Sequence, residues 1–131
     1  MWFKFKMNEE LNKKFRIFEQ KIMQIQQQLA SIEKAIADMS LIESGLEKLI
    51  GKKNEEILAP VGNGIFLQTK LLSEELFVEI AEKKLIKKSI PETRELIRSQ
   101  ILKLKKSQEI LETELDKINE DLTKTMQEYQ K

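Results

Sequence analysis

The feature that most constrains this chain is an apolar repeat, with alternating spacings of three and four residues, near each of its ends. The first run extends from Leu11 to Ile50 with one polar break at Glu43, and the second extends from Ile97 to Tyr129. Such spacing places apolar side chains in a narrow stripe along a helix, and one other helix suffices to bury that stripe. Each run therefore predicts a long helix that needs a helical partner.

We call the stripe the seam. Its positions in the first run are Leu11, Phe15, Phe18, Ile22, Ile25, Leu29, Ile32, Ile36, Met39, Glu43, Leu46 and Ile50, and in the second run Ile97, Ile101, Leu104, Gln108, Leu111, Leu115, Ile118, Leu122, Thr125 and Tyr129. An isolated polar residue in a seam usually fixes the register or the oligomeric state. Because a segment of different character separates the runs, the two helices are predicted to fold back as an antiparallel coiled-coil hairpin.

The sequence also predicts where these helices begin and end. The first is expected from near Asn8 to about Ile50, with Gly51 as a left-handed C-terminal cap. The second is expected to begin at the capping box Ser89-Ile90-Pro91-Glu92 and to continue to Lys131. At 1.5 Å per residue the two rods measure roughly 65 and 60 Å.

Between the rods the apolar period changes to two, which is typical of strands. Gly62-Asn63-Gly64 separates two apolar runs and predicts a hairpin, because these residues tolerate positive φ. A second hairpin is expected from residues 76–80 and 85–87, although the connection 81–84 lacks turn residues. We call residues 55–88 the hub. Because short strands expose unpaired edges and an uncovered apolar face, the hub is predicted to join chains into an oligomer.

The composition narrows the classes of function. The chain has 23 basic and 22 acidic residues, so a broadly basic surface for nucleic acid is not expected. It has no cysteine and no histidine, which removes disulfides, thiolate sites and the commonest general base. We therefore expect no enzyme activity, no cofactor and no metal. Without an apolar stretch of about 18 residues, we expect a cytoplasmic protein with neither a membrane nor a nucleic-acid partner.

Most aromatic residues gather at the end of the predicted rods that lies away from the hub. We call these residues the tip: Trp2, Phe3, Phe5, Met7, Leu11, Phe15, Ile17, Phe18, Met126 and Tyr129. Aromatic and methionine side chains at a free end form an adaptable apolar surface, suited to irregular partners. Two other interpretations stay open: a tail without a role, and a short basic-aromatic anchor on a membrane surface.

The order of these elements resembles the prefoldin family, and specifically its alpha-type subunits, both archaeal and eukaryotic. The most specific part is Leu58-Ala59-Pro60-Val61-Gly62-Asn63-Gly64-Ile65-Phe66, followed by Lys88-Ser89-Ile90 at the start of a long helix. The similarity spans about residues 8–125. One departure is the second hairpin, where the family usually has glycines and this chain has Ala81-Glu82-Lys83-Lys84.

The resemblance implies a molecular architecture and a function. Two alpha-type and four beta-type subunits would join through their hairpins into a double barrel that bears six coiled-coil tentacles. The hub residues that carry over by position are Ile57, Val61, Gly62, Asn63, Gly64, Ile65, Leu67, Leu76, Val78 and Ile80. The tentacle tips would hold unfolded polypeptides without nucleotide and pass them to a group II chaperonin.

The expected fold is therefore mainly α with a small β hub, in one domain of residues 1–131. It is divided into the tip and first helix (1–51), the hub (55–88) and the second helix (89–131). One alternative function remains open from the sequence: a structural adaptor whose hub and rods assemble folded partners. A scaffold has little reason to concentrate aromatic side chains at a free end, so the tip favours the chaperone.

Overall fold

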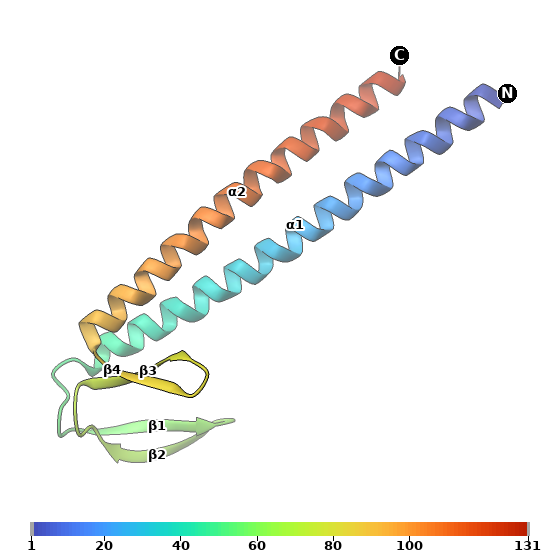
Figure 1. The fold of residues 1–131 in the computed structure, drawn as a ribbon. Helices are drawn as coiled ribbons and strands as arrows, with labels where there is room; N and C mark the ends of the chain where they lie inside the picture. The colour runs from blue at the N-terminus through green and yellow to red at the C-terminus, as the bar shows by residue number, and fades with distance from the viewer. Residues whose placement is uncertain (1, 131) are drawn as a thin grey trace. The chain divides into compact units, whose positions relative to one another are not determined.

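The computed structural model describes residues 2–130, with side chains for residues 8–129. Along the chain the elements are α1 (Trp2–Leu49), β1 (Glu56–Gly62), β2 (Ile65–Lys70), β3 (Glu75–Ala81), β4 (Lys84–Ser89) and α2 (Ile90–Gln130) (Figure 1). The strands form two separate antiparallel hairpins, β1 with β2 and β3 with β4. Two long helices joined by two β-hairpins confirm the predicted fold class.

The chain divides into two compact units. One contains the chain up to Ile36 and from Lys103 onward, and we call it the arm. The other contains residues 37–102, which include both hairpins, the end of α1 and the beginning of α2. The boundary cuts across both helices, so neither unit corresponds to a single predicted segment.

In the arm, α1 and α2 run antiparallel. The Lys14 ammonium lies 5.6 Å from the centroid of the Tyr129 ring, and Ile32 and Leu111 line a common groove. Later residues of α1 therefore lie beside earlier residues of α2. Buried or half-buried positions of α1 recur at the seam spacing, and Ile25 is only 7% exposed. On α2 the half-buried positions of this unit are Leu104, Gln108, Leu111, Leu115, Ile118, Leu122, Thr125 and Tyr129. The apolar stripe of each helix is therefore turned toward the other.

The predicted start of α1 was wrong, whereas its predicted end near Ile50 was close to the observed one. The helix begins at Trp2 rather than near Asn8, because no glycine or proline precedes Asn8 and continued backbone hydrogen bonding outweighs the N-cap preference. It ends at Leu49, which is half-buried, whereas the predicted seam residue Ile50 is 47% exposed. Gly51 follows with a φ of 77°, the left-handed cap that was predicted.

The start of α2 follows its capping sequence. The Ser89 hydroxyl accepts a hydrogen bond of 3.2 Å from the Glu92 amide, and Pro91 lies in the first turn. Ile90 is 2% exposed and Thr93 is 7% exposed, so two of the three buried residues of the described chain lie at the start of α2.

The two hairpins turn by different means. In the first, Gly62 pairs with Ile65, and both Asn63 and Gly64 have positive φ (45° and 77°), as a type I′ turn requires. In the second, Ala81 pairs with Lys84, and only Lys83 has positive φ (60°). The predicted second hairpin is therefore present without glycine.

Candidate functional site

The first hairpin exposes apolar side chains on both of its faces. Ile57, Ala59 and Thr69 share one face, because directly opposed residues of an antiparallel pair point the same way, and all three are half-buried. The opposite face carries Leu58 and Phe66, which are 68% and 57% exposed. The described chain leaves that second face uncovered.

The second hairpin has the same division. Leu76, Val78 and Ile86 share one face and are half-buried, whereas Phe77 and Leu85 on the other face are 65% and 60% exposed. The exposed face also carries charge. The Lys87 ammonium lies 5.5 Å from the centroid of the Phe77 ring and 3.9 Å from a Glu75 carboxylate oxygen on the partner strand.

The structure places the predicted hub residues in two groups. Ile57, Leu76 and Val78 are half-buried, and Val61, Ile65, Leu67 and Ile80 are exposed, as is the Gly62-Asn63-Gly64 turn. Sequence reasoning missed the opposite faces, which carry Leu58, Phe66, Phe77 and Leu85. A signal for them was present, because unbroken apolar runs such as residues 65–67 put apolar side chains on both faces of a strand.

These faces are incomplete as they stand. Each sheet has two strands, and a two-stranded hairpin is marginally stable alone in water. Burying one exposed valine, leucine, isoleucine or phenylalanine contributes about 1.5–3 kcal/mol. The hairpins can therefore gain several such contributions by packing against another surface, which makes them a candidate assembly site.

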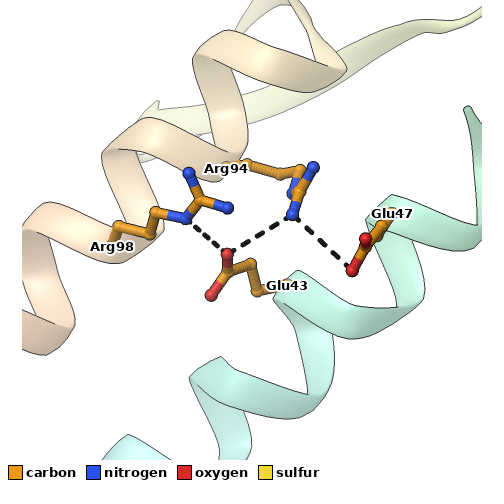
Figure 2. A network of polar contacts seen from close by, with 4 residues as sticks. All are labelled: Glu43, Glu47, Arg94 and Arg98. Atoms are coloured by element: carbon orange, nitrogen blue, oxygen red, sulfur yellow. Dashed lines mark hydrogen bonds and ion pairs between the residues drawn. The ribbon is translucent and has the colours of Figure 1, made fainter.

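An ionic cluster joins α1 to α2 close to the hairpins in sequence. Arg98 Nε donates a hydrogen bond of 2.6 Å to Glu43 Oε1 (Figure 2). Arg94 Nη2 lies 3.6 Å from the same Glu43 oxygen and 3.7 Å from Glu47 Oε2. The side chains of Arg94 and Glu43 are 18% and 22% exposed. Glu43, the polar break predicted in the seam of α1, therefore forms ion pairs with two arginines of α2. Arg94 is a seam residue that the sequence did not reveal.

The structure divides the predicted tip residues into three groups. Leu11, Phe15, Phe18 and Tyr129 are half-buried at seam positions of the arm. Ile17 and Met126 are 52% and 45% exposed. Trp2, Phe3, Phe5 and Met7 belong to α1, but their side chains lie outside the described residues. Within the described part, the accessible apolar surface of the tip therefore includes Ile17 and Met126.

Among the described residues, no three histidine, cysteine, aspartate or glutamate side chains lie together as potential metal ligands. Within residues 2–130, neither helix combines the length and apolar character needed to cross a bilayer.

Comparison with known proteins adds a family model and several relatives. The model of the prefoldin subunit matches residues 18–131. A prefoldin subunit alpha of Methanococcus vannielii is 25% identical over 129 residues, which cover 95% of this chain and 87% of that protein. A prefoldin subunit alpha of Methanobrevibacter smithii is 32% identical over 96 residues, which cover 72% of this chain and 65% of that protein.

A solved structure has the same fold. A cryo-EM structure of filamentous PFD from Methanocaldococcus jannaschii superposes with a TM-score of 0.77 at 18% identity, covering 89% of this chain and 98% of that one. The family model begins at Phe18, so most of the predicted tip precedes the matched region.

Proposed function

The chain belongs to the prefoldin family, and we propose from that premise that it is an alpha-type subunit of an ATP-independent holdase. In this proposal it helps to capture unfolded polypeptides in the cytoplasm and to deliver them to a group II chaperonin. The family supports a chaperone-type function, and the relatives named as alpha subunits support the type of subunit.

The hairpins are the proposed contact with other subunits. We propose an assembly of two copies of this chain with four beta-type subunits, joined through the hub. The observation that carries this proposal is the set of uncovered apolar faces: Leu58 and Phe66 on one hairpin, Phe77 and Leu85 on the other. Other hairpins would bury these faces and supply strands for their edges.

The tip is the proposed contact with clients. Phe15 and Phe18 belong to the seam as well as to the tip, so replacing them would also lower the stability of the arm. Ile17 and Met126 are better probes, because both are about half exposed on the described surface. Exposed apolar side chains at this end of the arm can contact an unfolded chain without a defined sequence.

The test is client protection by the assembled complex in the absence of nucleotide. Ile17→Ser with Met126→Ser should reduce the suppression of aggregation of a chemically unfolded model protein. Ile110→Ser is the matched control, because Ile110 is 62% exposed on α2 outside the tip. Its substitution should leave protection unchanged.

The outcomes separate the two candidate functions. Equal protection by the tip variant and the control would show that the tip does not contact clients. An assembly that never protects unfolded clients, but binds folded proteins, would overturn the holdase and favour a structural adaptor.

A further inference from the structure

On one flank of the arm, the side formed by α1 is uncharged over about three turns. Residues 22–32 contain no charged side chain, and they are the longest uncharged stretch in either helix of a chain that is 34% charged. Gln24 and Ser31 of this stretch are exposed and line a groove with Ser107 and Ile110 of α2. Surfaces that contact other proteins are depleted of charged residues, so this groove is suited to a protein partner.

The groove continues along the same flank. Gln24 also lines two adjoining hollows, one of which reaches Ile17, while the other contains Lys21 and Glu114. Ile17 and Ile110, near the two ends of the groove, are 52% and 62% exposed. We call the three hollows together the flank groove, and all of its lining residues belong to the arm. The flank groove therefore combines an uncharged α1 side with an exposed isoleucine toward each end.

The two helices keep one register through the arm. Lys14 contacts Tyr129, and 18 residues later Ile32 lies beside Leu111, which is 18 residues before Tyr129. Each step forward along α1 therefore corresponds to one step back along α2. This register fixes the level of every groove residue along the arm.

The register gives the flank groove an internal symmetry about the level of Ile25. Ile110 lies level with position 33 of α1, so Ile110 and Ile17 are equally far from Ile25 along the arm. Glu114 lies level with position 29, so Glu114 and Lys21 are also equally far from Ile25. At 1.5 Å per residue, the two isoleucines are about 24 Å apart along the arm and the two charged residues about 12 Å. The apolar pair and the charged pair therefore share one centre.

A second copy of this chain is the partner that fits this symmetry. If two arms met face to face and antiparallel, each Ile17 would reach the level of Ile110 in the other copy, and each Lys21 the level of Glu114. The same patch on both copies is the mark of a two-fold interface. Two basic and two acidic residues line the groove, so no net charge opposes the pairing. Its glutamine amides both donate and accept hydrogen bonds, so they can pair with the same amides of another copy.

We propose that the arms of two copies of this chain pair face to face and antiparallel through the flank groove, about a two-fold axis at the level of Ile25. The pairing uses the arm alone, so it is separate from assembly through the hairpins and does not rest on the proposed function. Because the two arms run in opposite directions, the pairing links copies from two assemblies whose arms point toward each other.

The first experiment locates the contact. The chain has no cysteine, so single cysteines can report it in the full chain. Ile17→Cys and Ile110→Cys are purified separately, each in its assembly, and then mixed with a short bismaleimide cross-linker. The mixture should give cross-linked chain pairs at about fivefold or more the yield of either variant alone, because pairing brings these unlike positions together. Glu109→Cys is the matched control, because it is exposed and adjacent to Ile110 but points about 100° away around α2. Mixed with Ile17→Cys, it should give only background cross-linking.

The second experiment tests the charges without cysteines. Lys21→Glu and Glu114→Lys lie at exposed positions, and each should raise the dissociation constant between assemblies about three- to tenfold at low salt, measured by sedimentation velocity. In an equimolar mixture of the two variants, each altered residue meets an opposite charge, so pairing should recover, and salt should weaken it. Recovery in the mixture excludes misfolding as the cause of the loss.

Three results would overturn the inference. One is a cross-linking yield for the mixture of Ile17→Cys and Ile110→Cys that does not exceed the Glu109→Cys control. Another is Ile17→Cys that cross-links to itself as well as it does to Ile110→Cys, because that result would mean parallel arms. The third is a groove whose cysteines link to an added unfolded polypeptide and not to a second copy, which would assign the flank groove to clients.

Discussion

The arm and the hairpins use apolar side chains in opposite ways. In the arm, apolar residues recur at seam spacing and are covered by the other helix of the same chain, so Ile25 is only 7% exposed. In the hairpins, Leu58 is 68% exposed and Phe77 is 65% exposed. The arm completes its apolar contacts within one chain, whereas the hairpins leave theirs for another surface.

The geometry of the two secondary structures accounts for this difference. A helix with a seam presents one narrow apolar stripe, and a single partner helix is enough to bury it. A two-stranded sheet has two faces and two free edges, and in this chain both faces carry apolar residues. Assembly should therefore depend on the hairpins, and the stability of each subunit should depend on the arm.

The largest expected effect comes from placing charge on an uncovered hairpin face. Leu58→Asp with Phe66→Asp should remove about 3–6 kcal/mol of association free energy, from two apolar side chains at 1.5–3 kcal/mol each. Native mass spectrometry should then show free subunits in place of the assembly. Leu41→Asp is the control, because Leu41 is 72% exposed on α1. An intact assembly with both aspartates would show that this face stays exposed in the complex.

The next effect tests the arm. Ile25→Ala should lower the free energy of unfolding by about 2–5 kcal/mol, because it leaves a cavity in the seam. Ile17→Ala, at an exposed position of the same helix, should change it by about 0.5 kcal/mol or less. Denaturant unfolding of the assembled protein, followed by circular dichroism, measures both. Equal effects at the two positions would contradict a seam closed within the chain.

The ionic cluster offers an intermediate test. Glu43→Leu should cost about 1–2 kcal/mol of stability, because it leaves the mostly buried Arg94 without its shared carboxylate. Adding Arg94→Leu should recover much of that loss, since two leucines would continue the apolar seam. A double-mutant cycle on the free energy of unfolding isolates the coupling. Strictly additive effects would mean that the cluster does not link the two helices energetically.

The smallest expected effect concerns the second turn. Lys83→Gly should raise stability by about 0.5–1 kcal/mol, because glycine adopts positive φ without the strain of a β-carbon. Glu82→Gly is the control and should lower stability, because the backbone of Glu82 does not adopt positive φ and glycine adds only conformational freedom to the unfolded chain there. The melting temperature of the assembly reports both changes. A Lys83→Gly variant that melts earlier would show that the lysine side chain contributes more than its backbone strain costs.

The sequence was most informative where one periodicity had one structural solution. Alternating spacings of three and four predicted both helices and the positions that are half-buried in the arm. Gly62-Asn63-Gly64 likewise predicted a turn, because few residues other than glycine and asparagine adopt its backbone angles. The start of α1 was harder to place, because Asn8 alone is not a strong enough signal to begin a helix, whereas the Gly51 cap marked its end correctly.

The hub could be predicted less completely. Residues of one alternation were chosen in β1, β2 and β3, and none was chosen in β4, so the opposite faces with Leu58, Phe66 and Phe77 were missed. Alternation cannot say which face is covered when both faces are apolar, because covering depends on the rest of the molecule. Arg94 was missed because a basic residue breaks the apolar pattern, and only the position of Glu43 across the seam explains its place there.

The antiparallel pairing of the arm also sets the order in which the chain can mature during synthesis. Lys14 contacts Tyr129, a residue near the opposite end of the sequence. The first helix therefore leaves the ribosome long before the helix that packs against it has been synthesised. At 5–20 residues per second, the stretch between Ile36 and Lys103 alone takes roughly 3–13 s to make. Throughout that time the nascent chain exposes an apolar stripe with nothing to cover it. A member of a chaperone family therefore passes through the same vulnerable state as the polypeptides that such a family protects.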